Sequence, residues 1–192
     1  DIFPEKAEEK KERFGLADAM VYDDYKKILG RDDIDLVDIC TPPFTHADIA
    51  VDFLNDQKNV ILEKPMAASI EECDRIIEAV EKNKKIFSPI AQNRFRNPIH
   101  KLKQILDSDI IGKPLHVQVD SLWWRGHCYY DLWWRGTWEK EGGGCTLNHA
   151  VHHIDMLIWM MGLPDSIYSV LSNVAHDNAE VEDISVAILK YK

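Results

Sequence analysis

Short apolar runs alternate with longer amphipathic stretches over the first 91 residues. The apolar runs are four to six residues long, which suits buried strands, and the stretches between them carry helix formers at helical spacing. The pattern predicts strands at 36–40, 59–62 and 86–91 and helices at 5–14, 23–30, 45–57 and 69–84. Strands that alternate with helices of about 10–15 residues indicate βαβ units and therefore a parallel sheet.

Local signals sharpen these boundaries. Asp23 is expected to cap the short helix that Gly30 closes, because a carboxylate at this position accepts a bond from a free backbone N–H. Residues 69–72 read Ser-Ile-Glu-Glu, the pattern of a capping box at a helix start. Pro89 weakens the third strand, since proline cannot donate to a sheet ladder.

The second half of the chain has a different pattern. Asn97 is expected to cap a helix to about residue 107, and apolar and polar residues alternate from 115 to 122 as in a half-buried strand. A further helix is predicted at 147–161 and further strands at 166–174 and 183–191. Three strands facing one helix form an open antiparallel sheet, so the predicted class is α/β. An incomplete Rossmann-like parallel-sheet domain at 1–95 precedes part of an α+β domain at 96–192.

Both ends of the chain suggest a piece of a longer protein. A doubly wound sheet needs a strand and a helix before Asp1, and the last predicted strand runs to the end of the chain at Lys192 without a turn. An open sheet edge would follow.

Composition narrows the function classes. The 192 residues are 45% hydrophobic and 29% charged, as in globular proteins, and no apolar run approaches the ~18 residues of a membrane span. The 23 basic against 33 acidic residues give a net charge of −10, which disfavours nucleic acid and anionic membranes as partners. The four cysteines form no C-x-x-C pair, and no secretion signal opens the chain, so we expect reduced thiols in a cytoplasmic protein.

The clearest candidate for chemistry is Lys64. It lies in Glu63-Lys64-Pro65, directly after a predicted strand, and ligands of open α/β sheets bind at the carboxyl ends of strands. Pro65 can fix a tight turn there, with a cis bond as one option. The loop at 41–43, Thr-Pro-Pro, ends the neighbouring strand and is expected beside it, although a solvated lysine is the commoner situation after a strand.

A second candidate is the segment that follows Gly142-Gly143-Gly144. Glycines let a backbone approach a ligand closely, and Asn148, His152 and Asp155 are spaced i, i+4 and i+7 along the predicted helix, so they share one face. Histidine transfers protons near neutral pH. His149 and His153 form another i, i+4 pair, but no third ligand stands at a fitting offset, so no metal site is expected.

The third feature is an echo: residues 123–126 and 133–136 both read Trp-Trp-Arg-Gly. Five of the six tryptophans lie between 123 and 138. Flat aromatic faces suit sugar rings, and arginine supplies hydrogen bonds, so Trp124 and Arg135 are candidate substrate contacts. The alternative is that the segment packs a loop against the sheet or builds an oligomer contact.

Together, the segments 38–46, 63–65 and 142–155 resemble the Gfo/Idh/MocA oxidoreductases. Members of that family have an N-terminal dinucleotide-binding Rossmann domain and a C-terminal α/β domain with a large open antiparallel sheet, often used for oligomerisation. They oxidise a hydroxyl of a sugar, inositol or related compound with NAD or NADP. The resemblance implies a homo-oligomer, a dimer or tetramer through the C-terminal sheet.

The resemblance also implies roles for individual residues. Lys64, His152 and Asn148 match the catalytic positions, although many members carry Asp where this chain has Asn148. The cofactor-binding positions would be Asp1, Thr41, Pro42, His46, Glu63, Lys64, Asn93 and Arg94. The substrate positions would be Lys64, Trp124, Arg135, Asn148, His149, His152 and Asp155. Asp1 favours NAD over NADP, because a carboxylate repels a 2′-phosphate.

The expected activity is therefore that of an NAD(P)-dependent sugar or polyol dehydrogenase. His152 would accept the hydroxyl proton while Lys64 binds the same oxygen, or Lys64 would itself be the base. Two other classes stay open: an NAD-dependent glycoside hydrolase and a non-catalytic cofactor-binding regulator. The glycine loop that holds the pyrophosphate would lie before Asp1, so the 192 residues alone are expected to be inactive.

Overall fold

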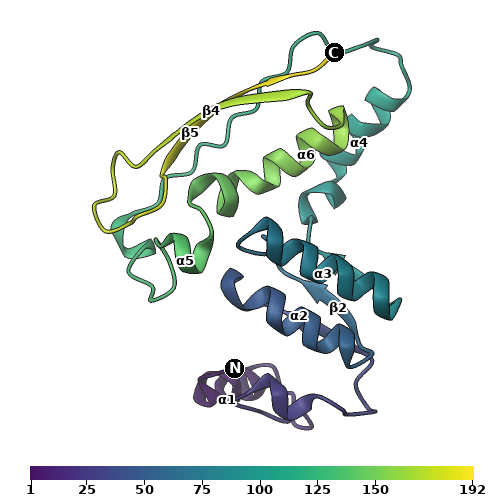
Figure 1. The fold of residues 1–192 in the computed structure, drawn as a ribbon, viewed down its shortest axis with the longest axis vertical. Helices are drawn as coiled ribbons and strands as arrows, with labels where there is room; N and C mark the ends of the chain where they lie inside the picture. Colours follow the sequence, from purple (N-terminus) through teal and green to yellow (C-terminus); the bar gives the residue numbers. More distant parts are fainter.

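The computed structural model describes all 192 residues as two sheets flanked by helices (Figure 1). The first half contains α1 (Pro4–Arg13), β1 (Leu36–Ile39), α2 (His46–Asn55), β2 (Asn59–Leu62), α3 (Ile70–Asn83) and β3 (Phe87–Pro89). The second half contains α4 (Asn97–Asp107), α5 (Trp138–Glu141), α6 (Val151–Met161), β4 (Ser166–Ser172) and β5 (Ile184–Lys190). Short 3₁₀ turns lie at Tyr25–Ile28, Pro43–Thr45, Gln92–Phe95 and His127–Tyr129, and a π-helix lies at Thr146–Ala150. The expected α/β class is confirmed.

The first sheet is parallel and has the order β1-β2-β3. Leu62 of β2 pairs with Ile39 of β1 and with Pro89 of β3, so the three strands end at the same edge. The loops that follow these strands therefore meet there, as the sequence predicted. One of them carries Lys64.

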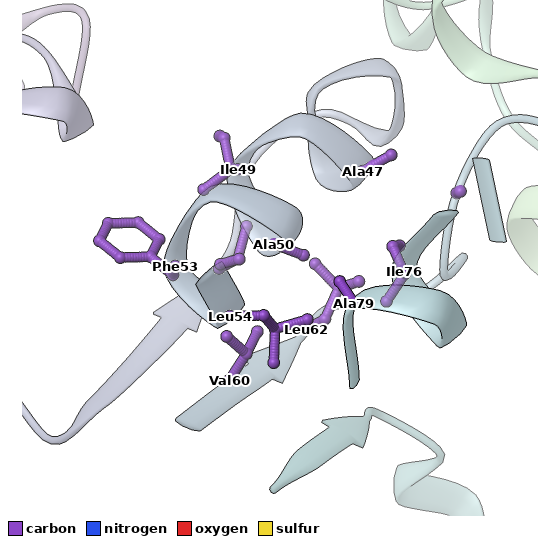
Figure 2. Packing of buried hydrophobic residues seen from close by; sticks show 11 residues of the cluster. Ala47, Ile49, Ala50, Phe53, Leu54, Val60, Leu62, Ile76 and Ala79 are labelled. Atoms are coloured by element: carbon purple, nitrogen blue, oxygen red, sulfur yellow. The ribbon is translucent and has the colours of Figure 1, made fainter. Parts of the chain in front are cut away.

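The core of the first half lies where α2 and α3 pack against β2 (Figure 2). Phe53 and Leu54 of α2, Val60 and Leu62 of β2 and Ile76 of α3 are at most 1% exposed. Burying a side chain of this size contributes roughly 1.5–3 kcal/mol, so this cluster anchors the sheet and its loops.

The predicted helix caps are only partly right. Ser69 Oγ accepts a hydrogen bond from the Glu72 backbone N–H at 3.2 Å, as predicted, but the Glu72 carboxylate accepts from the backbone N–H of Ala68. Asp24 rather than Asp23 caps the 3₁₀ turn at Tyr25–Ile28. The Asp23 carboxylate instead pairs with Lys27 one turn later, which removes it from the cap.

Asn97 does not cap α4, since this helix starts at Asn97 and has no side-chain cap.

The second sheet is a two-stranded antiparallel hairpin, β4-β5, and the predicted third strand at 115–122 is wrong. This segment has no ladder hydrogen bonds, and Leu115 and Leu122 are 96% and 88% exposed. Val117 and Val119 instead face α4 and α6 across an apolar cavity of about 460 Å³. Even these two valines are 46% and 45% exposed, so the alternation does not mark a buried face here. Alternating polarity alone does not supply the hydrogen-bonded neighbour that makes a strand.

The predicted helix at 147–161 is interrupted near its start. A π-helix covers Thr146–Ala150, and α6 follows from Val151 to Met161 beneath the hairpin (Figure 1). Each π turn holds more residues than an α turn, so Asn148 no longer has the α-helical offset from the other two predicted residues. His152 and Asp155 both lie in α6 and still share a face.

The parallel sheet ends at Pro89 and α4 begins at Asn97. The domain boundary near residue 95 stays a prediction. No helix of the structure combines the length and the apolar character that crossing a membrane requires.

Candidate active site

Lys64 links the two halves of the molecule. It follows β2, and its ammonium Nζ donates a hydrogen bond of 2.8 Å to the backbone carbonyl of Asn148, 84 residues away. The Lys64–Pro65 bond is cis, the option that the sequence raised. Burial lowers the pKa of Lys64, the Glu63 carboxylate opposes this, and Arg135 adds to it.

His46 stabilises the turn at Lys64–Pro65 through hydrogen bonds to backbone carbonyls. It is fully buried, and its two ring nitrogens lie 2.8 Å from the carbonyl oxygen of Pro65 and 2.7 Å from that of Thr41. Both ring nitrogens are thus engaged by backbone groups. His46, a predicted cofactor contact, connects the loops after β1 and β2 and holds them beside each other.

The glycine segment approaches protein backbone at two points. A Cβ at Gly142, where φ is +75°, would lie 2.4 Å from the carbonyl oxygen of Ala68. One at Gly144 would lie 1.9 Å from that of Glu182. Real Cβ atoms do not come so close, so both glycines are needed for packing. Gly142 lets the glycine segment approach the loop after Lys64, and Gly144 lets it approach the backbone that precedes β5.

Two of the predicted site residues, Asn148 and His152, have distinct environments. The Asn148 side chain is buried and donates to the carbonyl of Gly143 at 2.7 Å, so its backbone rather than its amide meets Lys64. His152 is half-buried, and burial together with the Lys64 charge lowers its pKa. It is therefore neutral at pH 7 and able to accept a proton.

Arg94 and Asp155 form the second bridge between the halves. The Arg94 guanidinium donates to both carboxylate oxygens of Asp155, at 2.8 Å and 2.5 Å. The pairing raises the pKa of Arg94. Sequence reasoning assigned one residue to the cofactor and the other to the substrate. The structure shows that they bind each other, 61 residues apart in the chain.

A polar cleft of about 310 Å³ opens beside this bridge. Asn93, Arg96, Trp123 and His152 contribute to its walls. Asn93, a predicted cofactor contact, is buried there. The cleft lies where the first half meets α6, which is the usual place for a site between two domains.

In the second Trp-Trp-Arg-Gly repeat, the arginine binds other side chains of the protein. Arg135 donates to the Glu141 carboxylate at 3.0 Å and to the Tyr129 hydroxyl. Its guanidinium lies over the rings of Tyr129 and Trp134, 3.9 Å and 4.1 Å from their centroids. Glu141 is 1% exposed and also accepts from the backbone N–H of Gly136. Arg135, a predicted substrate contact, thus has its main partners within the protein.

The first repeat is more open. Trp124 is 73% exposed and lies against the His176 ring, with centroids 5.2 Å apart. The Nε–H of Arg125 donates to Nε2 of His149 at 3.2 Å. Burial, aided by the charges of Arg125 and Lys64, lowers the pKa of His149 to about 4. His149 is therefore neutral at pH 7.

The sequence interpretation missed Arg125 and Glu141. Arg125 had a visible signal, because it occupies the same position of the repeat as Arg135. Glu141 directly precedes the three glycines, yet nothing in its local sequence shows that it is buried.

Of the cofactor residues predicted from the sequence, some lie beside the Lys64 turn and one, Asp1, is exposed at the start of the chain. Thr41 Oγ1 accepts from the Thr45 hydroxyl at 2.7 Å, and Glu63 accepts from the Lys64 backbone N–H at 3.0 Å. Asp1 is exposed and accepts from the backbone N–H of Phe3. A half-buried ammonium and hydroxyl groups at the carboxyl edge of a parallel sheet fit the nicotinamide end of a dinucleotide. The roles of Asp1, Thr41 and Pro42 stay predictions.

Two family models match the chain. Residues 1–90 match an oxidoreductase family with an NAD-binding Rossmann fold. Residues 99–192 match the GFO/IDH/MocA C-terminal domain. The two matches follow one another along the chain without overlap.

Individual relatives agree with these matches. Inositol 2-dehydrogenase of Salmonella typhimurium is 36% identical over 162 residues, covering 84% of this chain and 45% of the relative. Levoglucosan dehydrogenase of Pseudarthrobacter phenanthrenivorans is 34% identical over 171 residues, covering 88% and 43%. The chain thus spans about half the length of the curated relatives it matches.

Solved structures resemble the whole chain. The WlbA dehydrogenase from Bordetella pertussis, in complex with NADH and UDP-GlcNAcA, superposes with a TM-score of 0.93 at 28% identity, over 100% of this chain and 54% of that one. A levoglucosan dehydrogenase in complex with NADH and levoglucosan gives a TM-score of 0.83 at 28% identity, over 100% and 53%.

Proposed function

The chain belongs to the Gfo/Idh/MocA family of oxidoreductases, and we propose that its protein oxidises a hydroxyl group of a sugar, inositol or sugar derivative by hydride transfer to NAD. The observation that carries this proposal is the position of Lys64. Its half-buried ammonium lies at the carboxyl edge of the NAD-binding sheet and donates to Asn148 of the π-helix, near His152.

The relatives support the substrate class. The names of two relatives specify dehydrogenation of inositol and of levoglucosan, and one related structure holds levoglucosan together with NADH. Both compounds carry several secondary hydroxyl groups. We infer that the substrate of this protein does so as well.

The chemistry follows from two side chains. Bound NAD supplies the hydride acceptor. Neutral His152 accepts the proton of the substrate hydroxyl on a ring nitrogen while the C–H hydrogen leaves as hydride. The Lys64 ammonium donates a hydrogen bond to the same oxygen and stabilises the negative charge that develops on it. Burial strengthens this interaction because the local dielectric is low.

Three elements orient these groups. His46 fixes the Lys64 turn, and the Asn148 carbonyl accepts a hydrogen bond from the ammonium. The Arg94–Asp155 pair joins α6, which carries His152, to the loop after β3. Such rigid support is what places an acid–base group within reach of its proton.

The test uses the full-length protein and follows NADH formation from myo-inositol, levoglucosan and a panel of sugars. We expect Lys64→Ala to lower kcat by about 10²–10⁴-fold, as for loss of a group that stabilises charge in the transition state. The Kd for NADH should change far less. Lys82→Ala, which alters an exposed lysine of α3, is the control and should leave both unchanged.

His152→Asn separates the two assignments of the base. If His152 is the base, the variant loses the acidic limb of the kcat/KM pH profile along with most of its activity. If Lys64 is the base, that limb persists. Unchanged turnover in both variants would contradict the proposed function.

A further inference from the structure

Positive charge gathers beside Lys64 in a chain whose net charge is −10. Arg125 and Arg135 both lower the pKa of Lys64, after burial, and both lower that of His149. Both guanidinium groups contact the Tyr129 ring, at 5.4 Å for Arg125 and 3.9 Å for Arg135. Arg125 also donates to His149, the neighbour of the residue whose carbonyl binds Lys64, so the four side chains lie close together. We call this group, Lys64, Arg125, Arg135 and His149, the cationic wall.

Arg135 is neutralised within the protein. Glu141, the buried carboxylate of the second repeat, pairs with it at 3.0 Å and takes a further bond from the Gly136 backbone. Glu63 offsets part of the charge of Lys64. Lys64 forms no ion pair, but the carboxylates of Glu63 and Glu141 both oppose the lowering of its pKa. The remaining cation of the wall pairs with no carboxylate.

That cation is Arg125. Its guanidinium donates to Nε2 of His149 at 3.2 Å and to the carbonyl of Trp124 at 3.3 Å, which are both neutral acceptors. No ion pair of the structure includes it, whereas Arg94 and Arg135 each have a carboxylate. A half-buried guanidinium without a carboxylate retains donors that a ligand can use.

Arg125 is also held in place. His176 lies 2.7 Å from the Arg125 carbonyl through one ring nitrogen and donates through the other to Asp183 at 2.7 Å. The guanidinium lies 5.6 Å from the Trp123 ring centroid and 5.4 Å from that of Tyr129. A side chain fixed in this way loses little entropy when it binds a ligand.

We propose that Arg125 binds the carboxylate of an acidic sugar whose hydroxyl lies at Lys64, so that the substrate is a sugar acid rather than a neutral sugar. The planar guanidinium suits a carboxylate, because two parallel N–H groups can donate to its two oxygens. A ligand with one negative charge neutralises the uncompensated charge of the wall, and a neutral sugar does not. This inference rests on the proposed function and names the substrate class.

The first test measures binding and does not depend on turnover. D-glucuronate and D-glucose differ at one carbon, which is a carboxylate in the first and a hydroxymethyl group in the second. Each is titrated into the full-length protein with NADH present, using tryptophan fluorescence, because the Trp123 ring lies 5.6 Å from the Arg125 guanidinium. We expect glucuronate to bind at least about tenfold more tightly, and less tightly as salt increases.

Three variants assign the effect to Arg125. Arg125→Gln should lower glucuronate affinity at least about tenfold and leave glucose affinity unchanged, since it removes one charge-assisted pair. Arg125→Lys keeps the charge but lacks the paired planar N–H donors of a guanidinium, so it should retain part of the preference for glucuronate over glucose. Arg75→Gln removes an exposed arginine of α3, which pairs with Asp48, and should have no effect. Equal binding of the two sugars, or an unchanged preference in Arg125→Gln, would overturn the proposal.

Turnover separates this inference from the proposed function. NADH formed from neutral sugars alone, with no preference for glucuronate in binding, would overturn the role of Arg125 and leave the dehydrogenase proposal intact. Glucuronate bound through Arg125 with no NADH formed from any sugar would overturn the dehydrogenase proposal and leave the role of Arg125 in binding intact. A kcat/KM for glucuronate that falls tenfold in Arg125→Gln, with folding unchanged by circular dichroism, supports both.

Discussion

The two Trp-Trp-Arg-Gly repeats have the same sequence and different structures. In the repeat at 133–136, Arg135 lies between two aromatic rings and pairs with buried Glu141. In the repeat at 123–126, Arg125 has only neutral partners and Trp124 is largely exposed. One arginine completes a folded unit, and the other retains binding capacity.

The difference arises outside the repeats. Glu141 follows Arg135 by six residues, on the short helix α5, and no carboxylate takes the same place for Arg125. Gly136 has a φ of +78° and turns its N–H towards Glu141, whereas Gly126 has a φ of −79°. Identical side chains thus acquire different roles from the charges around them and from the backbone that follows.

The largest expected difference between the repeats is in the stability lost when each arginine is replaced. Arg135→Ala leaves the Glu141 carboxylate buried without its partner, which costs about 3–5 kcal/mol of unfolding free energy. Arg125→Ala breaks no ion pair and should cost about 1 kcal/mol or less. Urea unfolding of both variants measures this. Equal losses would show that the two environments do not differ as described.

A second expected effect comes from His149, which accepts a hydrogen bond from the first arginine, Arg125. Its pKa of about 4 lies below the ordinary 6.5, so the unfolded chain binds a proton more readily between these values. Stability that is present above pH 6.5 is therefore lost as the pH falls to 4, by about 2 kcal/mol after allowance for partial exposure. His149→Asn should remove this part of the pH dependence of urea unfolding. A slope that stays unchanged would exclude His149 as its source.

The smallest expected effect concerns the second tryptophan of each repeat. Trp134→Leu keeps an apolar side chain and removes the ring stacked on Arg135, which should cost about 1 kcal/mol. Trp124→Leu changes an exposed ring and should cost less than about 0.5 kcal/mol. Thermal unfolding of the two variants, compared with the unchanged chain, gives the difference. A larger loss at Trp124 would reverse the assignment of the two repeats.

Much of the fold could be predicted because its signals are local. The strands of the parallel sheet are short apolar runs, and the amphipathic helices between them keep a helical period, so β2 and α3 appear within a residue of their predicted ends. The strand predicted at 115–122 is wrong because alternating polarity does not supply the backbone partner that makes a strand.

In the candidate site too, features set by local sequence could be predicted and features set by tertiary contacts could not. The position of Lys64 at the sheet edge could be predicted because it directly follows a strand, while its role stays a prediction. The Arg94–Asp155 pair and the buried state of Glu141 could not be found, because both depend on contacts made only after the halves are folded together. The π-helix has no sequence signal of its own, so the predicted common face of Asn148, His152 and Asp155 assumed an uninterrupted α-helix.

The π-helix has a consequence for chain length. Successive residues of an α-helix are rotated by about 100°, so deletion of one residue within Thr146–Ala150 would turn everything before it by that angle relative to α6. The Asn148 carbonyl would then point away from Lys64, even if every side chain named above were kept. Insertions and deletions in this turn should therefore be tolerated less well than substitutions. The number of residues between the glycines and His152 should thus be constrained separately from their identity.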